Sequence, residues 1–282
     1  MKILYFIIGI IFIGVLSFII YKSKEDYDIY SSFRKNLNYI NKLVRKNNWK
    51  YYETDTKVKN WILSIINEVD CKNIFVSPNL YYGHPDLEFN YSHTMSDKII
   101  LSNNHYKQLQ KYYNKDDHNA VYDIGSLIVH ESVHIDQRFN YQKFKNLYKL
   151  WGYEFGNIEK FDHILETKRQ NPDADDDNVV WTNNNKYYFI NCFYDKNNPN
   201  ISVTKYAYPL LKIDNEFIYN GSDPILLNNL DSYNNFFGHI SNNYTPNEIC
   251  AEYTEIIFST CLVGKTNFNS DAFSIFKIYF DY

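Results

Sequence analysis

The sequence has no excess of basic residues, and this absence bears on whether the protein binds nucleic acid. Lys and Arg number 29 against 33 Asp and Glu, which gives a net charge of −4 over 282 residues. Proteins that coat DNA or RNA usually carry a basic excess, because they neutralise phosphates. The balance therefore argues against nucleic acid as the main partner. An apolar share of 45% with 22% charged residues also excludes a disordered chain.

Cysteine is scarce as well. The four cysteines, Cys71, Cys192, Cys250 and Cys261, are too few for a disulfide scaffold at this length, and none lies in a C-x-x-C pair. Cys250 and Cys261 fall on one predicted helix, where they would lie about 16 Å apart, too far for a disulfide. A bond between Cys71 and Cys192 stays open, and so does the redox compartment.

One long uncharged run stands at the amino terminus, from Ile3 to Tyr21. As a helix it would span about 28 Å, close to the hydrocarbon thickness of a membrane, which is about 30 Å. A cleaved signal peptide, giving a secreted protein, is the alternative. The run exceeds a usual signal core and lacks the small residues of a cleavage site. We expect residues 1–21 to be a single-pass membrane anchor, whose topology the flanking charges do not decide.

The rest of the chain has the pattern of an α+β protein. Residues 22–48 are polar and are expected to form a stalk or a first helix before one domain at 49–282. Apolar spacing predicts helices at 57–69, 105–113, 118–138, 141–153, 246–262 and 271–280. Strands are expected at 73–77, 98–102, 179–182, 186–192 and 216–219. We interpret residues 156–245 as a mixed insertion with little helix, and there is no internal repeat.

The segment that carries chemistry is His130-Glu131-Ser132-Val133-His134, an H-E-x-x-H motif in the middle of an apolar-periodic helix. Residues four apart lie on one face of a helix, so the two imidazoles can converge on one cation. Zinc suits such nitrogen ligands. From the next position Glu131 can reach a water molecule at the metal and take its proton.

This helix resembles the active-site helix of zincin metallopeptidases. The metzincin subgroup continues the motif with a glycine and a third histidine. It does not apply here, because these two positions hold Gln137 and Asn140. The pattern is gluzincin-like, and the resemblance implies a zincin-like domain, one zinc ion and a Glu ligand on a later helix. It also implies a peptide or protein substrate bound as an added strand beside Lys98–Ser102.

The resemblance points to Glu248, in the segment TPNEICAEYTE, as the third ligand, and to Glu252 as the later acid that supports a ligand histidine. Two alternatives stay open, Glu252 or Glu154 as the ligand. A structural role is also open, because Thr245-x-x-Glu248 is a capping box that would serve the start of its own helix.

Other candidates have weaker signals. Gln137 lies two turns after His130 and so faces the same side of the helix. Either His239 or Tyr244, shortly before Glu248, could donate a hydrogen bond to the oxyanion of a tetrahedral intermediate. An acidic run that begins at Asp173 is expected to be a solvated loop.

These features predict a membrane-anchored zinc metallopeptidase in which His130, His134 and Glu248 bind the metal and Glu131 is the general base. The alternative is a membrane protein with the same scaffold that binds or supports a partner without turnover. The intact Glu131 argues against this second hypothesis.

Overall fold

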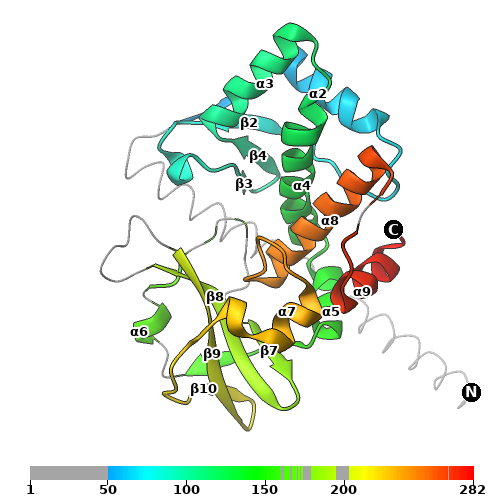
Figure 1. Cartoon of the computed structure of the whole chain (residues 1–282). Coiled ribbons are helices and arrows are strands. Elements are labelled where there is room, and N and C mark those ends of the chain that lie inside the picture. Colours follow the sequence, from blue (N-terminus) through cyan, green and yellow to red (C-terminus); the bar gives the residue numbers. More distant parts are fainter. Residues whose placement is uncertain are drawn as a thin grey trace, which may run out of the picture.

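The computed structural model describes residues 50–159, 162–165, 167–169, 171, 173, 179–194, 203–265 and 267–282. Over these residues the chain is a mixed α+β protein, as the sequence predicted. Its strands form two separate sheets. The sheets lie at opposite ends of the molecule, and α4 and α8 pass between them (Figure 1). The predicted metal ligands His130, His134 and Glu248 and the predicted general base Glu131 lie on these two helices.

The first sheet has four strands in the spatial order β1-β2-β4-β3. The strands are β1 (Tyr51–Glu53), β2 (Leu80–Gly83), β4 (Lys98–Leu101) and β3 (His93–Met95). β2 and β4 are parallel, and the other two pairings are antiparallel. The predicted strand at 98–102 is therefore confirmed, but it lies inside the sheet.

Two helices close to this sheet agree with the sequence prediction. α2 (Thr56–Glu68) starts where the Asp55 carboxylate accepts from the backbone amides of the first turn. α3 (Asn103–Lys115) starts at Ser102, whose hydroxyl accepts from His105 N at 3.1 Å. Such capping satisfies amide groups that have no partner inside the helix. Apolar side chains of α2, β4 and α3 then bury one another in a common core.

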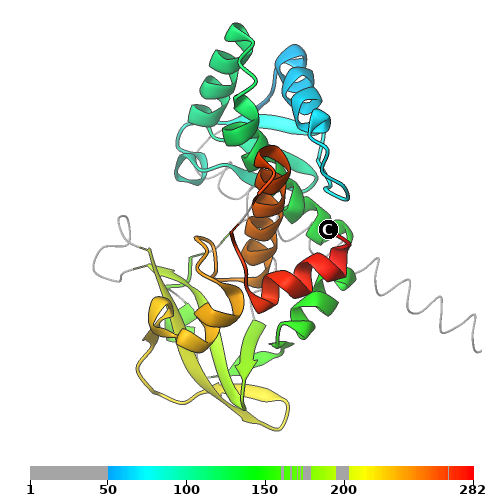
Figure 2. The ribbon, with the colours of Figure 1, turned by 45° about the vertical axis from the view of Figure 1, so that its right-hand side comes forward.

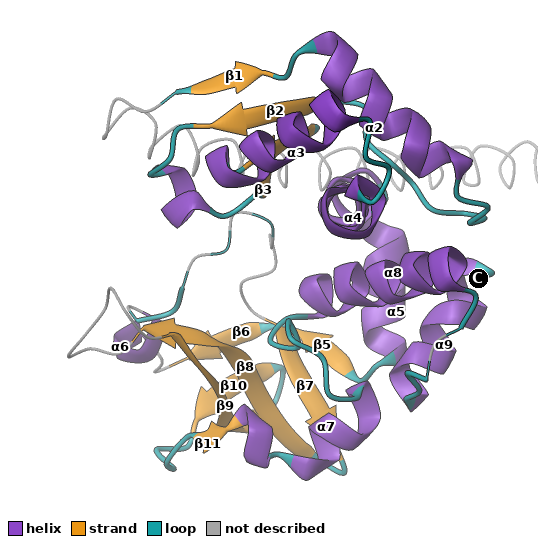
Figure 3. Cartoon of the chain, turned by 45° about the horizontal axis from the view of Figure 1, so that its top comes forward, coloured by secondary structure: helices purple, strands orange, loops and turns teal. Residues whose placement is uncertain are grey.

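The motif helix is α4 (Ser126–Phe139), preceded by one π-helical turn at Val121–Gly125. After a break at Asn140 the chain continues as α5 (Tyr141–Leu150). α8 (Pro246–Val263) begins after Thr245 with a proline in its first turn and ends at Gly264, which has a φ of 74°. The left-handed conformation at the end of a helix favours glycine, because glycine has no Cβ. α8 packs against α4, as Figure 3 shows.

The second sheet occupies the segment predicted as an insertion. Its strands run in the order β5-β7-β8-β9-β10-β6, and β11 pairs with β9. They are β5 (Tyr153–Phe155), β6 (Asn157–Glu159), β7 (Val179–Asn183), β8 (Lys186–Tyr194), β9 (Val203–Ile213), β10 (Glu216–Tyr219) and β11 (Ile225–Leu226). The predicted strands at 179–182, 186–192 and 216–219 are confirmed.

Strand β9 was not predicted from the sequence. Pro209 interrupts its pattern, and a proline inside an apolar run argues against a strand. Helix is short in this part of the chain, as expected. It consists of α6 (Asp162–Leu165) and α7 (Asp231–Phe237) among the described residues.

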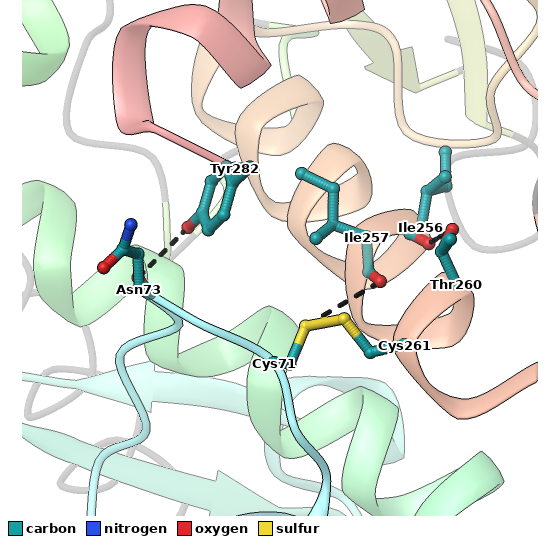
Figure 4. The surroundings of a disulfide bond; sticks show 7 residues. All are labelled: Cys71, Asn73, Ile256, Ile257, Thr260, Cys261 and Tyr282. Carbon is teal, nitrogen blue, oxygen red and sulfur yellow. Dashed lines mark hydrogen bonds between the residues drawn. A yellow bond between two sulfur atoms is a disulfide. The ribbon is translucent and has the colours of Figure 1, made fainter. Parts of the chain in front are cut away.

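A disulfide joins Cys71 to Cys261 near the end of α8, with a Cα–Cα distance of 5.6 Å (Figure 4). The sequence left a bond between Cys71 and Cys192 open, whereas the structure leaves Cys192 and Cys250 as buried free thiols. The bond links residues 190 apart in the chain. Spacing alone could not identify it, because it depends on how the segment before β2 packs on α8.

The predicted strand at 73–77 is wrong. Its backbone pairs with other elements instead of a neighbouring strand: Ser77 N donates to Ser132 Oγ on α4 at 2.9 Å. Asn73 adopts a positive φ, and its side chain donates to Asp281 O, after the end of α9 (Asp271–Phe280). The predicted helix at 271–280 is α9, which lies beside α8 in Figure 2.

The predicted anchor at residues 1–21 and the predicted stalk at 22–48 lie outside the described residues. Within the part of the chain that the structure describes, none of the helices has the length and apolar content needed to cross a membrane.

Candidate metal centre

Helix α4 places both motif histidines on one buried face. His130 is 8% exposed and His134 is 1% exposed, and their ring centroids lie 5.2 Å apart. The helix is fixed in this rotation because Ile128, Val129 and Ile135 are buried in the core beneath the first sheet. The two imidazoles consequently present their Nε2 atoms to the same point.

Helix α8 brings one carboxylate to this point, and it belongs to Glu248. Its Oε2 lies 3.6 Å from His130 Nε2, and its Oε1 lies 3.7 Å from His134 Nε2. The backbone amide of Glu248 is capped by Thr245 Oγ1 at 3.3 Å, so the amide half of the capping box is present. The carboxylate itself is directed at the histidine pair, which is the ligand arrangement and not the reciprocal cap.

The alternative ligand Glu154 is elsewhere. Its carboxylate forms an ion pair with Lys212 and accepts from Thr182 Oγ1 in the second sheet. Glu252 is also directed away from the histidines: it accepts from Ser241 N at 3.3 Å and from Asn242 Nδ2 at 3.1 Å. Of these three candidates, the structure brings only Glu248 to the two imidazoles.

The donor set fits a zinc ion. Ligands at about 2.0–2.1 Å in a tetrahedron lie roughly 3.3–3.4 Å from one another, close to the 3.6 and 3.7 Å observed. Glu131 supplies a second observation. Its Oε2 is buried without a hydrogen-bond partner among the described residues, although burying an unpaired carboxylate oxygen is costly. An ion and a water molecule at this place would satisfy it.

Each histidine has a partner on its outer nitrogen. His134 Nδ1 lies 3.0 Å from Gln137 Oε1, and Gln137 Nε2 donates to Asn247 O on α8 at 2.9 Å. The Gln137 oxygen must therefore accept, so Nδ1 of His134 carries the proton and its Nε2 keeps a lone pair. Gln137 thus lies on the same side of α4 as the motif histidines, as its spacing predicted, and it also ties α4 to α8.

For His130 the supporting acid is Glu255, not Glu252. Glu255 Oε2 lies 3.3 Å from His130 Nδ1, two helical turns beyond Glu248. A signal for this residue is present in the sequence, because positions 248, 252 and 255 share one face of α8. It could not show which of the two later acids reaches across to α4.

Burial and charge act strongly on these groups. Desolvation would lower the pKa of His130, but hydrogen bonds to Glu248 and Glu255 outweigh it and raise the pKa well above its usual value. For Glu248, desolvation acts upward, whereas His134 and His130 together lower the pKa to about 2. Burial raises the pKa of Glu131 well above the ordinary carboxylate range. A buried anion between two imidazoles makes the pocket suitable for a cation.

Of the two oxyanion candidates, Tyr244 lies close to the centre. Its hydroxyl accepts from Asn171 Nδ2 at 3.0 Å, and the same amide donates to Glu248 Oε1. Burial raises the pKa of the Tyr244 phenol well above its usual value, so it stays a donor. His239 instead lines a cavity of about 320 Å³ beside α8, together with Glu252 and Glu255.

Asp173 was expected in a solvated acidic loop, and this expectation is wrong for the side chain itself. Asp173 is 8% exposed, and its Oδ1 accepts from both Thr94 N and Thr94 Oγ1 at 2.6 Å. Carboxylate and imidazole atoms of Glu131, His134 and Asp173 all lie within 4.8 Å of one another. Arg138, also on α4, pairs with Asp173 at 4.0 Å and donates to Thr94 Oγ1 at 2.6 Å.

The expected docking strand also needs correction. β4 at Lys98–Leu101 has β2 on one side and β3 on the other, so no strand can be added to it. The edge of the sheet on this side is β3. The amide of Thr94 on β3 is directed away from β4, towards Asp173.

Comparison with known proteins gives no relative for this chain: no family model, no curated protein and no solved structure matches it. The functional argument therefore depends on the residues and the geometry alone.

Proposed function

We propose that this chain is a zinc metallopeptidase of the gluzincin-like type, held at a membrane by residues 1–21. The observation that supports it most directly is the convergence of His130, His134 and Glu248 around one point. Beside them lies the buried Oε2 of Glu131, which has no hydrogen-bond partner among the residues that the structure describes. Three protein ligands leave a fourth position open, which distinguishes catalytic from structural zinc.

In this proposal α4 supplies two metal ligands and the general base, and α8 supplies the third metal ligand. Bound zinc would supply a Lewis acid for the scissile carbonyl and lower the pKa of a water molecule. Glu131 takes a proton from the attacking water molecule while the water oxygen bonds to the carbonyl carbon. The same carboxyl delivers that proton to the leaving amine as the C–N bond breaks. Tyr244, which shares the Asn171 amide with Glu248, would donate to the developing oxyanion.

Supporting residues hold this arrangement in place. Gln137 and Glu255 fix the orientation of His134 and His130, and they leave the Nε2 atoms free for the metal. The protein substrate would reach the centre along β3, the edge strand, through main-chain hydrogen bonds.

The direct test is hydrolysis of a mixed peptide library by the full-length protein in detergent, with and without the zinc chelator 1,10-phenanthroline. Glu131→Gln should keep stoichiometric zinc and lose activity by about 10²–10⁴-fold, because the amide is similar in shape but cannot accept the proton. Glu68→Gln, at an exposed position on α2, is the matched control. Full activity in Glu131→Gln would remove this residue from the mechanism. A zinc-loaded wild type without any activity would favour the non-catalytic scaffold.

A further inference from the structure

Two side chains from outside the helices lie in the candidate centre. Asn171 and Asp173 belong to the chain between α6 and β7, and neither is predicted as a site residue by the motif. Asn171 Nδ2 donates to Glu248 Oε1 and to Tyr244 OH. It therefore uses one oxygen of the metal-binding carboxylate and the hydroxyl of the oxyanion candidate at the same time.

Asp173 occupies the other side of the centre. Its carboxylate lies within 4.8 Å of potential ligand atoms on Glu131 and His134. Asn171 Oδ1 accepts from Asp173 N at 3.0 Å, so the two residues hold each other in position. A carboxylate at this place competes for the open position that a catalytic zinc site needs.

Asp173 also takes the hydrogen-bonding position of the edge strand. An extended peptide adds to a sheet through the main-chain groups of its outermost strand. On β3 the outward amide of Thr94 is already used by Asp173 Oδ1 at 2.6 Å. Arg138 favours this arrangement, because it pairs with the same carboxylate from the buried side.

We propose that Asn171 and Asp173 hold the centre in a self-inhibited state, in which the chain fills its own substrate position. The inference rests on the proposed peptidase function and adds its regulation. An entering peptide has to displace Asp173 from Thr94 N and Asn171 from Tyr244. Only the small fraction of molecules in which these two residues have moved out of the centre can bind a ligand. The apparent dissociation constant of any ligand of the centre is therefore raised.

The experiment compares Asp173→Ala and Asn171→Ala with the wild type, using the full-length zinc-loaded protein in detergent. Two quantities are measured: the initial rate on the mixed peptide library, and the dissociation constant of acetohydroxamate by calorimetry. We expect Asp173→Ala to raise the rate about tenfold or more and to tighten acetohydroxamate binding, as removal of a closed state requires. Asn171→Ala should act in the same direction with a smaller effect. Asp223→Ala, an exposed acid outside the site, should change neither quantity.

Other outcomes contradict the proposal separately from the function. An active wild type whose rate and acetohydroxamate affinity are unchanged or lower in a folded Asp173→Ala overturns self-inhibition alone, and makes Asp173 a structural partner of Arg138. If Asp173→Ala does not fold, Asp173→Asn replaces it, because the amide keeps an acceptor for Thr94 N. A higher rate and tighter acetohydroxamate binding in Asp173→Asn would support self-inhibition, whereas unchanged or lower values would contradict it. A wild type that binds neither zinc nor acetohydroxamate overturns the peptidase function and this inference together.

Discussion

At the level of single residues, the candidate centre depends on the carboxylate of Glu248, which lies 114 positions beyond the last residue of the motif, His134. Glu248 is 5% exposed and lies between two imidazoles, which compensate its charge inside this cluster. A buried charge without a partner is expensive, and this makes the three residues mutually dependent. Their substitution should therefore affect metal binding first.

Glu248→Ala should weaken zinc binding by more than about 100-fold, because loss of a supporting residue alone typically costs about 10–100-fold. Glu154→Ala should retain stoichiometric zinc, since that carboxylate pairs with Lys212. Zinc content by mass spectrometry, measured beside the thermal midpoint, checks both variants. Stoichiometric zinc in Glu248→Ala, with only about 1 kcal/mol of stability lost, would instead support the capping role.

Glu255 and Glu252 form a matched pair on the same helix face. Glu255→Gln should lower zinc affinity by about 10–100-fold, because it removes the carboxylate that orients His130. Glu252→Gln should leave the affinity unchanged, because that side chain binds Ser241 and Asn242. Competition with a fluorescent zinc chelator measures both constants. The reverse order of effects would return the supporting role to Glu252.

At the level of elements, α4 and α8 must keep a fixed register for the ligands to meet. Ala251 on α8 is fully buried, and Gln137 spans the two helices through Asn247 O. At the far end of α8, the Cys71–Cys261 disulfide links the helix to the segment that leads into β2. The helix is thus held at both the ligand end and the carboxyl end.

Removal of this disulfide should lower the free energy of unfolding. A bond that closes so long a loop contributes about 2–5 kcal/mol, chiefly by restricting the unfolded chain. Cys71→Ser with Cys261→Ser should shift the urea midpoint downward accordingly. Reductant should shift the wild type in the same direction and leave the double variant unchanged. Equal midpoints for all four samples would show that the bond does not contribute.

At the level of the whole molecule, the two sheets lie on either side of the helix pair α4 and α8 (Figure 1). The first sheet and α4 supply the histidines and the edge strand. The second sheet fills the long gap between α5 and α8, and the chain within it supplies Asn171 and Asp173. The gap is therefore more than a spacer, because it returns two side chains to the centre.

The membrane anchor is a prediction for the complete chain. Alkaline carbonate extraction should leave the full-length protein in the membrane pellet, because an uncharged run of nineteen residues is long enough to span the hydrocarbon layer. A version that starts at residue 22 should appear in the supernatant. Extraction of the full-length protein, or a mature amino terminus near residue 22, would contradict the anchor.

The sequence by itself determined the features that depend on local periodicity. Residues four apart share a helix face, so the pairing of His130 with His134 and the position of Gln137 follow from spacing alone. The helices at 57–69, 246–262 and 271–280 follow from apolar patterns and capping residues. The surrounding sequence favoured Glu248 as the third ligand, but Glu252 and Glu154 remained possible.

Only the tertiary structure decided which distant groups meet. The choice of Glu248, the support by Glu255, the burial of Asp173 and the Cys71–Cys261 bond all depend on packing between segments far apart in the chain. The same is true of the edge strand: the resemblance implied Lys98–Ser102, but strand order is a property of the whole sheet, and it places β3 at the edge on this side. Periodicity fixes the direction of a side chain along its own element, whereas its partner is fixed by the burial of both elements in a common core.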